Sequence, residues 1–129
     1  MQERLRKLLE HSYSPNYNYY VASIIKTHDG KTFEGVNVET TTPASGICAE
    51  RNALYSLITA GYKKEDIKEI YIMNKTNKPC YPCFVCRSAL YDFCDPNTKI
   101  ITYSYDGKEE KILLKDLCPY PFGEDDLSD

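Results

Sequence analysis

Alternation of apolar and polar positions predicts a pair of strands in the first third of the chain. Residues 19–26 (Y-Y-V-A-S-I-I-K) are rich in β-branched and aromatic side chains, and residues 31–39 (K-T-F-E-G-V-N-V-E) alternate with a period of two. His28, Asp29 and Gly30 supply a tight turn between them. The two segments therefore predict a β-hairpin.

Helical spacing of apolar residues predicts helices on both sides of this hairpin. Residues 1–11 predict an amphipathic helix, and residues 48–60 predict a second helix that Gly61 ends. Residues 83–93 and 115–118 predict two more. The apolar positions that repeat at this spacing are Leu5, Leu8 and Leu9 in the first helix, and Ala53, Leu54, Leu57 and Ile58 in the second.

Short apolar runs at residues 68–74 and 99–105 predict two further strands, which alternate with the later helices. A chain of 129 residues has the length of one compact domain, so we expect residues 1–129 to form a single unit. The order of elements predicts a layered α/β fold with a mixed sheet. We expect it to be antiparallel at the hairpin and parallel afterward, through right-handed crossovers.

Charge and composition exclude several classes of function. The formal net charge is −3 and the basic residues are scattered, whereas nucleic-acid binders usually carry a basic face. No apolar run approaches membrane-spanning length. The first eleven residues mix Glu with Lys and Arg, which argues against a secretory signal. We therefore expect a cytoplasmic protein whose partner is neither a nucleic acid nor a membrane.

The chain contains six cysteines, and three of them have the spacing of metal ligands. A C-x-x-C pair, Cys83 and Cys86, together with the upstream Cys48 predicts zinc binding rather than a disulfide framework. Three thiolates leave the fourth tetrahedral position of zinc open, as in catalytic sites. Cys94 and Cys118 belong to no motif, and we expect them to be small buried residues.

Two readings of the C-x-x-C pair are possible, because Cys80 and Cys83 also fit P-C-x-x-C. We prefer Cys83 and Cys86, because that pair opens directly into a predicted helix and Pro82 is a natural residue before a helix start. Cys80 then binds no metal. A separate alternative is that Cys80 joins Cys48, Cys83 and Cys86 as a fourth thiolate and closes the site, which would make it a structural zinc module.

Glu50 lies two residues after Cys48, in the run C-A-E-R. It could move a proton without binding the metal, and a C-x-E followed by P-C-x-x-C is typical of zinc-dependent nucleobase deaminases. Both cysteine motifs open predicted helices. Their N-termini, with Arg51 and Arg87, would offset the negative charge of three thiolates and lower the thiol pKa values.

Four motifs together resemble the cytidine deaminase family, in its short, homotetrameric branch. They are G-V-N-V-E, C-A-E-R, P-C-F-V-C-R and the C-terminal D-L-C-P-Y-P-F-G-E-D-D-L. The resemblance implies a three-layer α/β/α fold with a central mixed sheet of five strands. It implies one Zn²⁺ per chain and hydrolytic deamination of cytidine and 2′-deoxycytidine in pyrimidine salvage.

The same resemblance assigns substrate-binding roles residue by residue. Asn37 and Glu39 would hold the ribose hydroxyls, for which an amide and a carboxylate supply a donor and an acceptor. Tyr19 stands where the family has a Phe that packs on the pyrimidine, and Ala49 would contact the substrate. Phe122 would cover the base site of a neighbouring subunit.

The chain also departs from the family pattern. V-G-A-A becomes V-A-S-I at residues 21–24, and N-A-S-Y becomes T-T-T-P at residues 40–43; Phe84 and Ser88 replace the usual Gly and Gln. V-A-S and G-V-N-V are similar to blasticidin S deaminase, so a modified cytosine nucleoside is the alternative substrate. The blasticidin S deaminase branch lacks an acidic residue at the position of Glu39, and it lacks the P-Y-P-F-G ending.

Deaminases that edit tRNA or polynucleotides usually have His at the position of Cys48.

Overall fold

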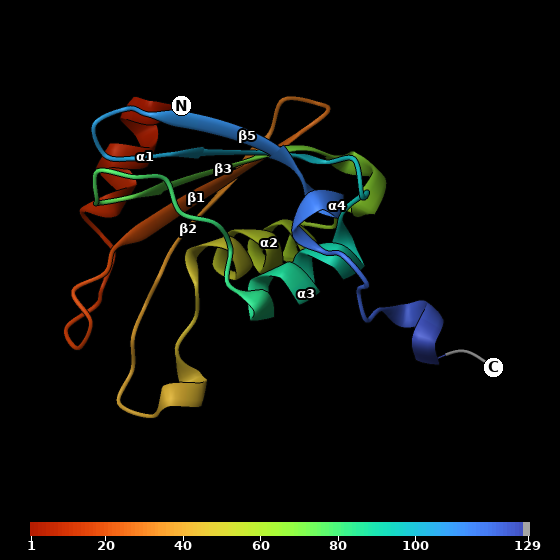
Figure 1. Ribbon diagram of the computed structural model, residues 1–129, viewed down its shortest axis with the longest axis horizontal. Coiled ribbons are helices and arrows are strands. Elements are labelled where there is room, and N and C mark those ends of the chain that lie inside the picture. Colours follow the sequence, from red (N-terminus) through yellow and green to blue (C-terminus); the bar gives the residue numbers. More distant parts are fainter. Residues whose placement is uncertain (128–129) are drawn as a thin grey trace.

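A central five-stranded sheet organises the computed structural model, which describes residues 1–127 (Figure 1). The strands lie in the order β2-β1-β3-β4-β5. Their bounds are Val21–Thr27 (β1), Thr32–Val36 (β2), Ile67–Asn74 (β3), Lys99–Tyr103 (β4) and Glu109–Leu113 (β5). The α-helices are Gln2–Leu9 (α1), Ala49–Thr59 (α2), Phe84–Phe93 (α3) and Leu114–Leu117 (α4). The predicted α/β fold with a mixed five-stranded sheet is confirmed.

The direction of strand pairing is only partly as predicted. The hairpin of β1 and β2 is antiparallel, and β3 and β4 pair in parallel. However, β3 also pairs antiparallel with β1, and β5 pairs antiparallel with β4. Parallel pairing after the hairpin is therefore confirmed for β3 with β4, and it is wrong for β3 with β1 and for β5 with β4. A tight turn joins β4 to β5 at Gly107, and so short a connection permits only antiparallel neighbours.

The segment that forms β5 gave no strand signal in the apolar pattern. It begins Glu109, Glu110 and Lys111, all of them exposed. Charged side chains are common on edge strands, because they discourage the free edge from pairing with another chain. The same feature hides such a strand from an analysis of hydrophobic periodicity.

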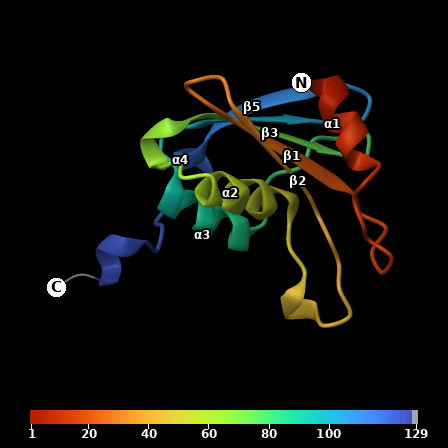
Figure 2. The same ribbon diagram turned by 180° about the vertical axis from the view of Figure 1, so that it is seen from behind.

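Helices cover the sheet on both faces, with α1 on one side and α2 and α3 on the other (Figures 1 and 2). Two separate clusters of buried side chains correspond to these faces. In α1, Leu5 and Leu9 are buried and Leu8 is half-buried, as its predicted amphipathic face requires. Cys94 is fully buried, as expected, whereas Cys118 is only half-buried. Among the described residues, no helix has the length and apolar character needed to cross a membrane.

A close backbone contact sets the position of α2 over β2. A Cβ atom added at Gly35 would lie 2.5 Å from the backbone nitrogen of Ala53 and 2.6 Å from the carbonyl oxygen of Ala49. The side-chain amide of Asn52 donates a hydrogen bond of 3.1 Å to the carbonyl of Val36. The N-terminus of α2 is thereby held against the strand that leads to residues 37–39.

Candidate active site

Two helix N-termini bring the predicted metal ligands together. Cys48 is the residue before α2, Cys83 is the residue before α3, and Cys86 lies in the first turn of α3. The first turns of such helices have unpaired N–H groups and partial positive charge, which stabilise thiolates. The architecture therefore favours negative charge where the three sulfur atoms meet.

The spacing of the three thiols fits a metal ion. The Sγ atoms of Cys48, Cys83 and Cys86 all lie within 4.8 Å of one another, and those of Cys48 and Cys83 are 3.7 Å apart. Tetrahedral zinc with Zn–S bonds of about 2.3 Å would separate two sulfur ligands by roughly 3.8 Å. A disulfide would need about 2.05 Å. Cys80 lies outside this group, so the geometry favours Cys83 and Cys86 as the C-x-x-C pair.

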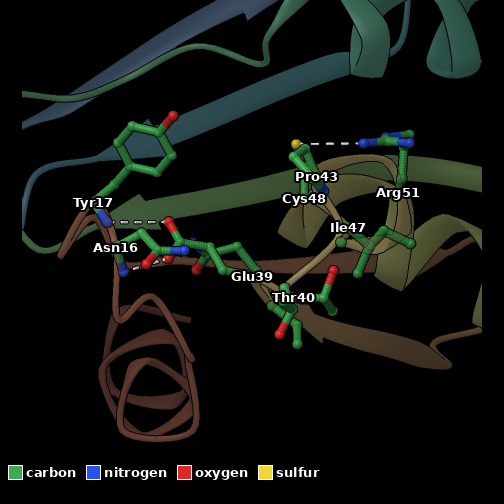
Figure 3. Close-up of a pocket in the computed structure, with 12 residues that line it drawn as sticks. Asn16, Tyr17, Glu39, Thr40, Pro43, Ile47, Cys48 and Arg51 are labelled. Carbon is green, nitrogen blue, oxygen red and sulfur yellow. Dashed lines mark hydrogen bonds between the residues drawn. The ribbon is translucent and has the colours of Figure 1, made fainter.

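Charge is distributed unevenly among these thiols. The Cys86 thiol is the main cause that lowers the pKa of Cys48 to about 5, and Arg51, whose guanidinium donates to the Cys48 sulfur at 3.6 Å, lowers it further (Figure 3). The interaction with Cys48 is also the main cause that raises the pKa of Cys86, although Arg51 lowers it. Cys48 is therefore the thiol that more readily carries negative charge, and Arg51 donates a hydrogen bond to it.

Glu50 projects from the first turn of α2 into a dry environment. Its side chain is only 5% exposed, and this burial is the main reason why its pKa rises to about 7. The negative charge of Cys48 raises the pKa further. A carboxyl group with a pKa near neutrality can both accept and donate a proton, which is the property that general acid–base catalysis requires.

Arg87 follows Cys86 directly and makes its side-chain hydrogen bonds to the backbone. Its hydrogen bonds go to the carbonyl oxygens of Pro82 at 2.7 Å and Leu117 at 3.2 Å, and its guanidinium stacks 4.4 Å from the centre of the Phe84 ring. Its donors therefore bind backbone oxygens rather than a thiol. Through Pro82, Arg87 holds the segment immediately before Cys83.

Asn37 follows β2 and is tied to the segment before β1. Its Oδ1 atom accepts hydrogen bonds from the Ser12 hydroxyl and, at 2.8 Å, from the backbone N–H of Val21. Its amide nitrogen donates to the carbonyl of Tyr19 at 2.7 Å. The side-chain oxygen of Asn37 is thus used within the protein, and one amide N–H remains.

Glu39 is held by the same segment. Its carboxylate accepts from the Ser14 hydroxyl and the Asn16 N–H, both at 2.8 Å, and from the Tyr17 N–H at 3.3 Å (Figure 3). Desolvation alone would raise the pKa of Glu39, but these hydrogen bonds outweigh it and lower the pKa. Sequence reasoning missed Ser14 and Asn16, which no motif singles out.

One cavity of about 550 Å³ extends from Asn37 and Glu39 to Cys48 (Figure 3). It lies between the segment 16–17, the loop that follows β2, and the N-terminus of α2. Its lining residues are Asn16, Tyr17, Asn37, Val38, Glu39, Thr40, Thr41, Pro43, Gly46, Ile47, Cys48 and Arg51. A single ligand in this cavity could therefore contact both Glu39 and Cys48.

The remaining predicted substrate residues lie apart from this lining. Ala49 is fully buried at the start of α2, and Tyr19 is 41% exposed just before β1. Phe122 is 67% exposed and borders a separate hollow of about 250 Å³ with Phe84 and Tyr120. Within one chain, Phe122 is therefore not part of the cavity at Cys48.

Comparisons with known proteins agree with this site. Residues 1–103 match the cytidine and deoxycytidylate deaminase zinc-binding region. The chain is 32% identical to cytidine deaminase of Mycoplasma genitalium, covering 89% of this chain and 87% of that one. It is 28% identical to cytidine deaminase of Halalkalibacterium halodurans (93% and 89% covered). The solved cytidine deaminase of Burkholderia pseudomallei is 32% identical, with a TM-score of 0.88 over 93% of this chain and 94% of that one.

Proposed function

The chain belongs to the cytidine and deoxycytidylate deaminase zinc-binding family, and from this premise we propose that it hydrolyses cytidine and 2′-deoxycytidine to uridine and 2′-deoxyuridine, with release of ammonia. The observation that carries the proposal is the meeting of three thiols with a buried carboxyl group at the N-termini of α2 and α3. No closed four-thiolate site is favoured, because Cys80 lies outside the group.

Cys48, Cys83 and Cys86 would hold one Zn²⁺ per chain. Their mutual distances suit tetrahedral coordination with one position left for water. When bound, the metal would lower the pKa of that water and so supply the nucleophile at neutral pH. Arg51 would stabilise the charge on the Cys48 thiolate through its 3.6 Å hydrogen bond.

Glu50 would carry the protons of the reaction. It would accept one from the attacking water and place it on ring nitrogen 3 of cytosine, which makes carbon 4 electrophilic. A new C–O bond then forms at carbon 4. Glu50 would next take the proton of the new hydroxyl group on carbon 4 and transfer it to the amino group. The C–N bond would then break, ammonia would leave and a carbonyl would remain at carbon 4. Its burial excludes bulk water from these transfers.

Asn37 and Glu39 would recognise the sugar through one hydroxyl. Asn37 has one amide N–H beyond the hydrogen bond to Tyr19, and the Glu39 carboxylate, with about four acceptor sites, has three in use. A single hydroxyl can accept from the first and donate to the second. Asn37 and Glu39 would therefore bind one sugar hydroxyl and make no contact with a second. This supports activity on cytidine and 2′-deoxycytidine alike, because the hydroxyl that 2′-deoxycytidine lacks would not be needed.

Tyr19, Ala49 and Phe122 would complete the base site, with Phe122 supplied by a neighbouring subunit of a homotetramer. Support comes from the exposed apolar surface formed by Phe84, Tyr120 and Phe122, of which Tyr120 is fully exposed. Such surfaces often mark subunit contacts. Sedimentation or light scattering of the purified protein would distinguish a tetramer from a monomer.

We assign the reaction to pyrimidine salvage in the cytoplasm. All six cysteines are free, and a site built from three of them needs a reducing compartment. The substrate would be a small molecule such as a free nucleoside, since the cavity that reaches both Glu39 and Cys48 has a volume of about 550 Å³, which is typical of small-molecule sites.

The direct test follows the ultraviolet absorbance of cytidine, 2′-deoxycytidine, cytosine, CMP and blasticidin S with the zinc-loaded protein. We expect loss of the cytosine band and ammonia release with the two nucleosides. Glu50→Gln should keep its zinc and lose at least about a hundred-fold in kcat. Glu3→Gln, on α1 beyond the sheet, is the matched control and should be fully active. No turnover of any cytosine compound by the wild-type protein would refute the proposal.

A further inference from the structure

Tyr19 has a hydroxyl group that the predicted contact with the base leaves unexplained. The side chain is 41% exposed overall, but its tip points into the protein. Asn74, the last residue of β3 and only 2% exposed, donates a hydrogen bond of 3.1 Å from its amide nitrogen to the Tyr19 hydroxyl oxygen. An aromatic ring that serves only as a flat surface would not need this buried amide.

Tyr19 adjoins the residues predicted to bind the sugar. The backbone of Tyr19 is also fixed, since its carbonyl accepts from Asn37 and its N–H donates to Ser14. With both ends held, the ring has a defined orientation before any ligand arrives.

Asn74 lowers the stability of the fold, which a purely structural role would not explain. Its Oδ1 atom is buried and has no hydrogen-bond partner among the described residues. An unpaired buried acceptor destabilises the folded state, and an apolar residue at the end of β3 would avoid that loss. The amide is therefore explained by the one interaction it makes, which is the hydrogen bond to Tyr19.

We propose that Asn74 is a positioning residue, which fixes the Tyr19 ring as the rigid wall against which the cytosine base packs. The inference rests on the proposed deaminase function. A preset wall contributes equally to binding of the substrate and of the transition state, so its loss should raise KM and leave kcat nearly unchanged.

A double-mutant cycle on cytidine deamination tests the link between Asn74 and Tyr19. Tyr19→Phe and Asn74→Leu should each raise KM about five-fold, the effect of one neutral hydrogen bond. The double variant should show the same rise as either single variant, because both remove the same interaction. Tyr20→Phe is the matched control. It removes the neighbouring hydroxyl, which is bonded to Asn18, and should leave KM unchanged.

Zinc content should match that of the wild-type protein in Tyr19→Phe, in Asn74→Leu and in the double variant. Additive effects in the cycle, a fall in kcat without a change in KM, or metal loss in any of these variants would overturn the proposal. These outcomes leave the deaminase function intact, whereas an inactive wild-type protein would refute that function and this inference together.

Discussion

Replacing Gly35 by Ala should damage catalysis more than it damages the fold. The added methyl carbon would lie 2.5 Å from the Ala53 nitrogen and 2.6 Å from the Ala49 oxygen, about 1 Å short of an ordinary contact of 3.4 Å. Both obstacles are backbone atoms of α2, so no side-chain rotation can relieve the clash. The helix must move away from β2, and Cys48 and Glu50 must move with it.

The expected magnitudes follow from that displacement. Overpacking of this kind costs about 1–3 kcal/mol of unfolding free energy, which a urea titration would measure. A displacement of about 1 Å between catalytic and binding groups can cost about a hundred-fold in rate. We therefore expect Gly35→Ala to fold and to lose about a hundred-fold in kcat/KM for cytidine.

Gly30→Ala is the matched control for this change. Gly30 has a positive φ of 88° in the hairpin turn, and no atom lies within 4 Å of its added carbon. Alanine there is strained by about 1–3 kcal/mol, which resembles the cost at Gly35, but α2 does not move. Its kcat/KM should equal that of the wild-type protein. If Gly35→Ala kept kcat/KM within three-fold of wild type, the argument from the β2–α2 contact would be wrong.

Three further results are expected. Cys83→Ser should lose most of its bound zinc while Cys80→Ser keeps it, as metal analysis after gel filtration would show; equal loss in both would favour the other C-x-x-C reading. Glu39→Gln should raise KM about ten-fold or more for cytidine and 2′-deoxycytidine alike, because it removes a charged hydrogen-bond acceptor; a change confined to cytidine would contradict recognition through a single hydroxyl. In a tetramer, Phe122→Ala should raise KM without changing zinc content, and it should have no effect if the active protein is a monomer.

Local spacing was sufficient to predict the reacting groups. Cys48 and Glu50 are separated by one residue, and Cys83 and Cys86 by one helical turn, so the start of a helix fixes where each side chain points. Helix N-termini also stabilise the charge that these groups carry. The chemistry of the site therefore depends on short-range order, which is the part of a fold that a sequence pattern records most directly.

Partners that lie far apart in the chain could not be predicted in this way. Ser14 and Glu39 are 25 residues apart and Tyr19 and Asn74 are 55 apart, and each pair meets only because β1 lies between β2 and β3 in the sheet. No periodicity marks a serine or an asparagine for such a contact. The orientation of Arg87 has the same origin, because its acceptor at Leu117 belongs to a distant helix.

Tyr19 is where the two halves of the proposed substrate site are joined. Its carbonyl binds Asn37, its N–H binds the Ser14 hydroxyl, and that hydroxyl in turn binds Glu39. Its side chain meanwhile is tied to Asn74, at the other edge of β1. The residues for the sugar and the wall for the base therefore share one support, since any movement of Tyr19 alters both. Because this segment is held before the nucleoside arrives, both parts of the site are preorganised, so the affinity for the whole nucleoside should exceed what separate contacts to base and sugar provide.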